Sequence, residues 1–264
     1  MRAMNDDITP ELSVICVYND PQKLETYFQS GLSIQTMPVE VVLLDNTAHQ
    51  FASAAEALNF GASQAKGRYL VFMHQDILLE TPTAWQELLG YFNSGYSLIG
   101  VSGMRKVYPF MMSNVTTGTH DPHAAANWIC TKVRKPTKVE TFDECFFAMT
   151  REVYDLLRFD EVLCDNWHMY GVDLCLSAKE RGISAWVVPI KMHHQSGGCI
   201  NKAFVYNLLA VIQKHRIVWM AAPCYHFLAV KPCVWLLYYY WQLVYRLAGK
   251  KRKTSVCGAP ERIR

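Results

Sequence analysis

The chain has 264 residues, of which 51% are hydrophobic and 19% are charged. This composition supplies enough apolar side chains for a sizeable core and excludes an intrinsically disordered chain. The formal charge of +3 is too small to indicate a nucleic-acid-binding protein. Residues 249–264 carry six basic residues against one acidic residue, so the rest of the chain is close to neutral.

Nine cysteines are scattered from Cys16 to Cys257, and no two of them have CxxC spacing. The odd number and the wide spacing argue against a disulfide framework and against a zinc site built from cysteines. Reduced and mostly buried thiols are typical of a reducing compartment. The first twelve residues are polar and acidic and contain no apolar signal-peptide segment, so we expect a cytoplasmic protein.

Predicted strands and helices alternate over the first hundred residues. Continuous apolar runs at 12–18, 39–44 and 69–73 predict strands buried on both faces, and a shorter strand is expected at 97–101. The intervening helices are predicted at 21–33, begun by Asp20 and Pro21, at 53–66, ended by Gly67, and at 82–92. This βαβαβαβ order predicts a doubly wound, mostly parallel α/β sheet flanked by helices.

The second half is less regular. Residues 104–138 have few periodic features, which predicts a long loop with short strands. We expect strands at 141–150 and 184–188, and helices at 151–158, at 171–181 with Gly182 as its stop, and at 204–219.

The segment from 217 to 248 is rich in aromatic residues. Its charge-free runs, 217–230 and 232–245, are shorter than the roughly 20 residues that span a bilayer. Gln242, Arg246 and Lys250 are spaced by four and form one polar helical face, while residues 238–241 supply interfacial aromatics. With the basic cluster at 250–253, this pattern predicts docking on an anionic membrane surface. The alternative is that the aromatics pack on the protein or form an oligomer interface.

Polar residues follow three predicted strands. Tyr18 and Asn19, Asp45, and Asp76 all lie at carboxyl ends, where ligands bind in such sheets. Carboxylates there suit a nucleoside diphosphate, because one can accept hydrogen bonds from a ribose or base and another can hold a divalent cation. The alternative is that these aspartates only cap the following helices.

Two further groups carry candidate chemistry. His193 and His194 are candidate metal ligands if Asp76 lies beside them, and otherwise a histidine pair without a ligand role. Asp173 begins a predicted helix and can act as a general base if it faces a pocket. Its alternative role is a favourable interaction with the helix dipole. Asp143 and Glu144 form another acidic pair near the same expected edge.

Six segments in this order raise the specificity of the pattern. They are LSVICVYND, VVLLDNT, NFGASQAKGRYLVFMHQDI, ETFDECFFAMTREV, FDEVLCDNWHMYGVDLCLSAKERG and VVPIKMHHQSGG. Over residues 11–200 the chain resembles the GT-A glycosyltransferases of the large family-2-like group. The resemblance implies one nucleotide-sugar-binding catalytic domain at 11–200, followed by a helical segment and basic tail at 201–264.

The resemblance also implies an activity and roles for single residues. It implies an inverting, metal-dependent transfer of a sugar from a UDP- or GDP-type donor to a glycan or lipid-linked acceptor, with the acceptor governed by residues 104–140. Tyr18, Asn19, Asp45 and Asn59 would contact the nucleotide, and Asp173 would be the catalytic base. Asp76 matches the last carboxylate of the DxD-type motif, and His194 or His193 would complete a site for Mn²⁺ or Mg²⁺. Here the motif is His-Gln-Asp, so its first carboxylate is missing.

Two other functions are compatible with these residues. A nucleotidyltransferase also uses an α/β sheet and a metal-bound carboxylate, but the segment VYNDPQKLE lacks the glycine-rich basic loop that binds a triphosphate. A non-catalytic nucleotide- or glycan-binding protein of the same fold would explain the incomplete motif. Release of nucleoside diphosphate from the donor would indicate a glycosyltransferase. Release of pyrophosphate would indicate a nucleotidyltransferase, and binding without turnover a non-catalytic protein.

Overall fold

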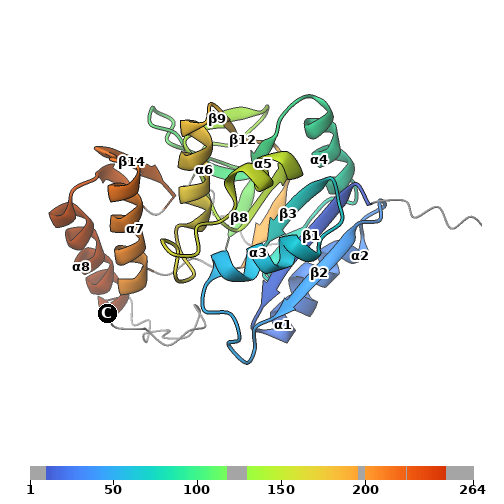
Figure 1. Ribbon diagram of the computed structural model, residues 1–264, viewed down its shortest axis with the longest axis horizontal. Helices are drawn as coiled ribbons and strands as arrows, with labels where there is room; N and C mark the ends of the chain where they lie inside the picture. Colours follow the sequence, from blue (N-terminus) through green and yellow to red (C-terminus); the bar gives the residue numbers. More distant parts are fainter. Residues whose placement is uncertain (1–9, 118–129, 196–199, 224, 248–264) are drawn as a thin grey trace, which may run out of the picture.

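A seven-stranded sheet forms the centre of the computed structural model, which describes residues 10–117, 130–195, 200–223 and 225–247 (Figure 1). The strand order is β2-β1-β3-β11-β5-β12-β9, with β9 and β11 antiparallel to their neighbours and the other strands parallel. The strands are β1 (Leu12–Tyr18), β2 (Glu40–Asp45), β3 (Tyr69–Met73), β5 (Leu98–Gly100), β9 (Thr137–Val139), β11 (Phe146–Thr150) and β12 (Ala185–Val187). The predicted mostly parallel α/β sheet is confirmed.

Helices cover both faces of this sheet (Figure 1). They are α1 (Pro21–Lys23), the π-helical η1 (Leu24–Gln29), α2 (Ser30–Ser33), α3 (Ala54–Gln64), α4 (Ala84–Asn93), α5 (Arg151–Leu157) and α6 (Tyr170–Glu180). One core lies between the sheet and α3, α5 and α6, and a second lies between the sheet and η1 and α4. Phe72 belongs to the first core and Val71 to the second, which explains why β3 is apolar at every position.

The first helical segment begins as predicted. The Asp20 side chain accepts a hydrogen bond from the Lys23 N–H at 3.1 Å, and Pro21 occupies the first helical position. Gly182 has a φ of 75° just beyond α6, the left-handed conformation that ends a helix.

The predicted strand at 141–150 is in fact two strands joined by a turn. They are β10 (Thr141–Phe142) and β11, and in the turn the Asp143 carboxylate accepts a hydrogen bond from the Cys145 N–H at 3.0 Å. This local bond competes with strand pairing and lets the chain leave one sheet and enter another. β10 pairs with β6 (Ser102–Met104), whereas β11 enters the central sheet between β3 and β5.

Two small sheets flank the carboxyl edge of the main sheet. Their orders are β10-β6-β7 and β4-β13-β8. Their other strands are β4 (Ile77–Leu79), β6 (Ser102–Met104), β7 (Met111–Ser113), β8 (Val115–Thr117) and β13 (Met192–His194). Within the predicted irregular region 104–138, β7, β8 and β9 are short strands, and residues 118–129 lie outside the described part of the chain.

The C-terminal segment contains α7 (Lys202–Lys214), β14 (Trp219–Ala222), β15 (Tyr225–Leu228) and α8 (Lys231–Leu247), at the left of Figure 1. The predicted helix at 204–219 therefore ends early. Arg216 has a φ of 50°, so the backbone leaves the helical conformation and turns into β14.

A third core joins this segment to α6. Met169 and Val172 pack with Phe204, Leu208 and Val234. The Thr141 hydroxyl also donates a buried hydrogen bond of 2.6 Å to the Ala221 carbonyl. Both parts of the chain contribute to this core. The predicted boundary at residue 200 between a catalytic domain and a C-terminal segment therefore stays a prediction. In the described part of the chain, no helix has both the length and the apolar character needed to cross a bilayer.

Gly67 has a different role from the predicted helix stop, because α3 ends at Gln64 and Ala65 is already extended. The Gly67 N–H donates to the Ser13 hydroxyl at 2.7 Å. A Cβ atom on Gly67 would lie 2.5 Å from that hydroxyl oxygen and 2.6 Å from the Ser13 backbone nitrogen. The close approach of two backbones therefore requires glycine at this position.

We predict that Gly67→Ala lowers the free energy of unfolding by about 1–3 kcal/mol, because the added methyl group overpacks the β1 backbone. Gly90 in α4 is the matched control, since a Cβ there meets nothing within 4 Å. Gly90→Ala should stabilise the protein by about 1 kcal/mol through helix propensity. Denaturant unfolding measures both variants, and equal stability of the two would contradict the packing argument.

Candidate functional site

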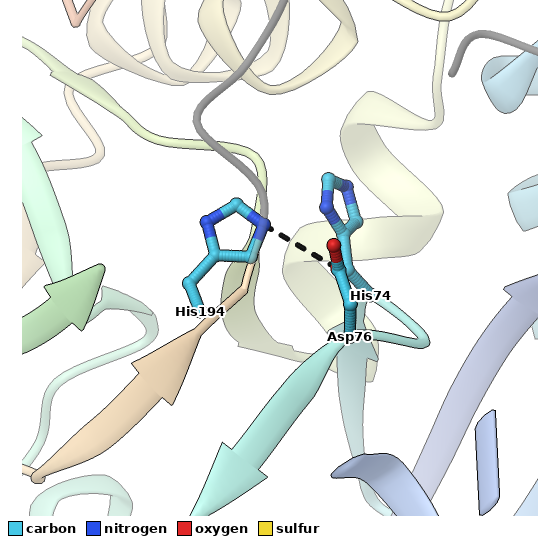
Figure 2. Close-up of side chains that lie close together, drawn as sticks. All are labelled: His74, Asp76 and His194. Atoms are coloured by element: carbon cyan, nitrogen blue, oxygen red, sulfur yellow. Dashed lines mark ion pairs between the residues drawn. The ribbon is translucent and has the colours of Figure 1, made fainter. Parts of the chain in front are cut away.

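His74, Asp76 and His194 converge beyond the carboxyl end of β3 (Figure 2). Each residue offers a ligand atom within 4.8 Å of the others, and His194 Nε2 lies 3.4 Å from Asp76 Oδ1. His74 and Asp76 lie in the turn between β3 and β4, and β13 pairs antiparallel with β4 so that His194 is opposite Ile77. Two chain segments far apart in sequence thus meet through strand pairing.

The structure distinguishes the two adjacent histidines. Successive residues of a strand point to opposite faces, so only one of them can face Asp76. His193 is buried on the other side, where its Nδ1 lies 3.0 Å from the Thr116 hydroxyl and its ring stacks with Tyr27. His194 is therefore the histidine that the fold brings to the cluster.

His74 is a candidate ligand that the sequence reasoning missed. Its signal was its place in His-Gln-Asp, two residues before Asp76, where a DxD-type motif has its first carboxylate. A histidine at this position can serve in place of the carboxylate, because an imidazole also binds metal ions. His74 Nε2 lies 2.9 Å from the Tyr170 hydroxyl at the start of α6, which holds the ring in place.

The charges of the cluster suit a cation. Burial raises the pKa of Asp76, but the close His194 imidazole outweighs it, and the pKa falls to about 2. Burial lowers the pKa of His194, but Asp76 outweighs burial and raises it overall. Burial lowers the pKa of His74. An anionic carboxylate is thus held beside two imidazoles in a mostly buried place.

The donor set also fits a divalent metal. His194 Nε2 is buried and has no hydrogen-bond partner among the described residues, only its ion-pair contact with Asp76. Such an atom is available for a metal bond once it is deprotonated. Two nitrogen ligands and one oxygen ligand suit Mn²⁺ better than Mg²⁺, which prefers an all-oxygen shell.

The strand-end residues predicted to contact a nucleotide lie beside this cluster. Gln75 connects them to it, because its Nε2 donates to Asn19 Oδ1 at 2.7 Å and its Oε1 accepts the N–H of Asn19 at 3.1 Å. Tyr18 lies opposite Asp45 in the β1–β2 register. The Asp45 carboxylate is exposed and accepts the Thr47 N–H at 2.8 Å, which lowers its pKa. Three of the four predicted nucleotide contacts therefore lie at one edge of the sheet.

Asn59 lies elsewhere. Its Nδ2 donates to the Phe159 carbonyl at 3.0 Å and to Glu161 at 2.7 Å, while its Oδ1 accepts from Tyr154 and from the Phe159 N–H, both at 3.1 Å. These bonds engage both donors of the amide and its acceptor. They tie α3 to the loop after α5, so the contacts of Asn59 in this structure are structural ones.

Asp173 is buried in α6 and faces the basic side chains of Lys214 and His215 at the end of α7. Its carboxylate lies 2.8 Å from Lys214 Nζ and 2.8 Å from His215 Nε2. Burial lowers the pKa of His215, but its bonds to Asp173 and to Glu180 outweigh burial and raise it. Asp173 does not belong to the histidine–aspartate cluster, and its role as base stays a prediction.

Glu144 lies between the cluster and α6. Its Oε1 accepts the Gly171 N–H at 2.9 Å at the start of the helix, and its backbone carbonyl accepts the Tyr170 hydroxyl at 3.4 Å. Burial raises the pKa of the Glu144 carboxyl to about 8. Since Tyr170 also contacts His74, a short chain of polar contacts links α6 to the cluster.

The sequence matches a family model described as "Glycosyltransferase like family" over residues 13–220, well over half of the chain. The chain belongs to this glycosyltransferase-like family. The curated proteins include a relative that is 26% identical over 224 residues, covering 80% of this chain and 86% of its own length. It is named "ATP synthase subunits region ORF 6" and comes from Fuscovulum blasticum.

Solved glycosyltransferases share the fold. GalNAc-T7 with UDP, GalNAc and Mn²⁺ has a TM-score of 0.56 at 16% identity, and 81% of this chain covers 49% of that one. PcManGT, a mannosyltransferase from Pyrobaculum calidifontis in complex with GDP-Man and Mn²⁺, has a TM-score of 0.54 at 13% identity, covering 93% and 77%. TarS 1-349 from S. aureus, with UDP-GlcNAc, has a TM-score of 0.53 at 12% identity, covering 77% and 66%. The expected GT-A fold is confirmed, and this chain spans about half the length of the GalNAc-T7 chain.

Proposed function

We propose that this protein is an inverting hexosyltransferase that moves a sugar from a UDP- or GDP-type donor to a glycan or lipid-linked acceptor, in polysaccharide biosynthesis. The observation that carries the proposal is the cluster of His74, Asp76 and His194 beside Tyr18, Asn19 and Asp45. It lies where open α/β sheets bind nucleotides. The family match supports the same reaction class.

Each residue has a defined part in this proposal. Tyr18 and Asp45 would receive the base and ribose, and His74, Asp76 and His194 would hold Mn²⁺, with Mg²⁺ as the weaker alternative. When bound, the divalent cation neutralises negative charge on the nucleoside diphosphate as it leaves. Gln75 fixes the Asn19 backbone against the turn that carries His74 and Asp76, so the nucleotide and diphosphate parts of the site keep one geometry.

The base removes the proton of the acceptor hydroxyl as its oxygen attacks C1 of the sugar. We retain Asp173 for this role and weigh it against Glu144, the other buried carboxyl near the start of α6. Burial raises the pKa of Glu144 to about 8, so only the minor, ionised part of it could act as a base at pH 7. Asp173 stays the first candidate because it is the carboxylate that matches the base of the inverting members of the family.

The C-terminal segment is proposed to place the enzyme on an anionic membrane surface, where lipid-linked or envelope glycans occur. The expected polar face is corrected at Gln242, which turns inward and donates to the Ile200 carbonyl at 3.0 Å. Arg246 is exposed, as expected, and Lys250 lies outside the described residues. Of the predicted interfacial aromatics, Tyr238 is buried. The outward face of α8 is apolar instead: Leu236, Tyr239, Tyr240, Leu243 and Leu247 are 55–79% exposed. The basic cluster at 250–253 lies outside the described residues.

Metal binding tests the site. Asp76→Ala and His194→Ala should each weaken Mn²⁺ binding in the presence of nucleoside diphosphate by at least about 100-fold, because losing even an outer-shell partner costs 10–100-fold. His193→Gln is the matched control and should keep the affinity, since His193 faces Thr116. Isothermal titration calorimetry measures all three variants. Wild-type Mn²⁺ affinity in His194→Ala would contradict the ligand assignment.

The base assignment has its own test. Asp173→Asn should lower the transfer rate at pH 7 by about 10²–10⁴-fold while donor binding stays near wild type. The melting temperature should fall, because Lys214 and His215 lose their carboxylate partner, so the rate is measured at a temperature where the variant is folded. Glu144→Gln keeps an acceptor for the Gly171 N–H and should turn over at nearly the wild-type rate. Steady-state kinetics of both variants, with a donor that supports turnover, measures these rates. A slow Glu144→Gln variant beside a fast Asp173→Asn variant would move the base role to Glu144.

Vesicle flotation tests the membrane proposal. Leu236→Glu combined with Leu243→Glu should abolish flotation with anionic liposomes and leave Val234 and Tyr238 buried in the third core. Val162→Glu is the control, since Val162 is exposed but lies outside this segment. Each basic residue near the surface contributes about 1 kcal/mol, so salt should weaken attachment. If wild type does not float, or if the double variant changes the oligomeric state instead, the surface is a protein interface.

A further inference from the structure

A second group of potential metal ligands shares His194 with the first. Asp143, Cys145 and His194 each offer one ligand atom, and these atoms lie within 4.8 Å of one another. Cys145 is buried and carries a free thiol. The group goes beyond the proposed function, which assigns no role to Asp143 or Cys145.

The fold holds this group beside the first one. Asp143 and Cys145 lie in the turn that enters β11, and the Cys145 carbonyl accepts the His74 N–H at 3.0 Å. The antiparallel pairing of β11 with β3 continues from this bond, with Phe146 opposite Met73. The thiol is thus fixed next to the turn that carries His74 and Asp76.

The two ligand sets differ in chemistry. Two imidazoles and a carboxylate suit Mn²⁺, whereas a thiol, an imidazole and a carboxylate suit a softer ion that takes sulfur ligands. Zn²⁺ is bound tetrahedrally by these three ligand types, and three protein ligands leave its fourth position open. Cysteine spacing excludes only sites built from pairs of cysteines. One cysteine can still share a metal ion with an aspartate and a histidine that are distant in sequence.

We propose that Asp143, Cys145 and His194 form a second metal site that takes a soft divalent cation, Zn²⁺, and that occupying it excludes Mn²⁺ from the neighbouring site. The exclusion follows because both sets need the imidazole of His194. On binding, the Cys145 sulfur exchanges its proton for the metal and one proton is released to solvent.

Cobalt substitution tests the ligand set without measuring activity. Co²⁺ reports a thiolate ligand through a charge-transfer absorption in the near ultraviolet, and it adopts the sites of Zn²⁺. The full-length protein, kept anaerobic, should show this band on titration with Co²⁺. Cys145→Ser and His194→Ala should lose it. Cys164→Ser should keep it, because Cys164 is an equally buried thiol that belongs to neither group.

Competition separates this proposal from the proposed function. Zn²⁺ affinity, measured against a chromophoric chelator, should fall by at least about 100-fold in Cys145→Ser. His74→Ala should keep the Co²⁺ band and lose Mn²⁺ binding, so that a failure of one site does not imply a failure of the other. In wild type, added Zn²⁺ should release bound Mn²⁺, seen by the return of the free-ion electron paramagnetic resonance signal.

Three results would overturn the proposal. They are a wild-type protein without the charge-transfer band, a band that persists in Cys145→Ser, and Mn²⁺ that stays bound when Zn²⁺ is saturating. The wild-type measurements decide the question even if Cys145→Ser does not fold, which far-ultraviolet circular dichroism of that variant would reveal.

Discussion

The candidate site depends on one strand, β11, which enters the central sheet antiparallel between β3 and β5. The bond from the His74 N–H to the Cys145 carbonyl lies at the start of this pairing. It places the turn that holds Asp143 and Glu144 beside the turn that holds His74 and Asp76. Without the β11–β3 pairing, these two turns, which are about 70 residues apart in the sequence, would not be held side by side.

A second long-range pairing completes the same place. The β4–β13 pairing brings His194 to Asp76, and strand alternation sends His193 to the opposite face. The close contact of the two side chains lowers the pKa of Asp76 to about 2 and raises that of His194. A metal ion and a proton would therefore compete for the His194 imidazole.

The C-terminal segment is joined to the rest of the protein through α6. Asp173 is paired with Lys214 and His215, and both of these basic side chains come from the end of α7. Removing one partner of a buried ion pair usually costs more than the pair contributes, so this contact constrains any rearrangement of α7. The same helix begins at Tyr170 and Gly171, which contact His74 and Glu144. α6 therefore connects the C-terminal segment, which is proposed to dock on a membrane, to the candidate site.

The sequence by itself determined the local structure and the class of chemistry. Continuous apolar runs predict β1 and β3 because both of their faces are buried, and Asp20 with Pro21 predicts the first helical turn because local bonds decide it. Strand-end polar residues predict Tyr18, Asp45 and Asp76 at one edge, since parallel strands share that edge. Only the tertiary structure decided that β11 lies between β3 and β5, that His74 joins the cluster, that His194 rather than His193 faces Asp76, and that Cys145 lies beside them. These are pairings between distant segments, and their energies come from contacts that a local pattern of residues does not encode.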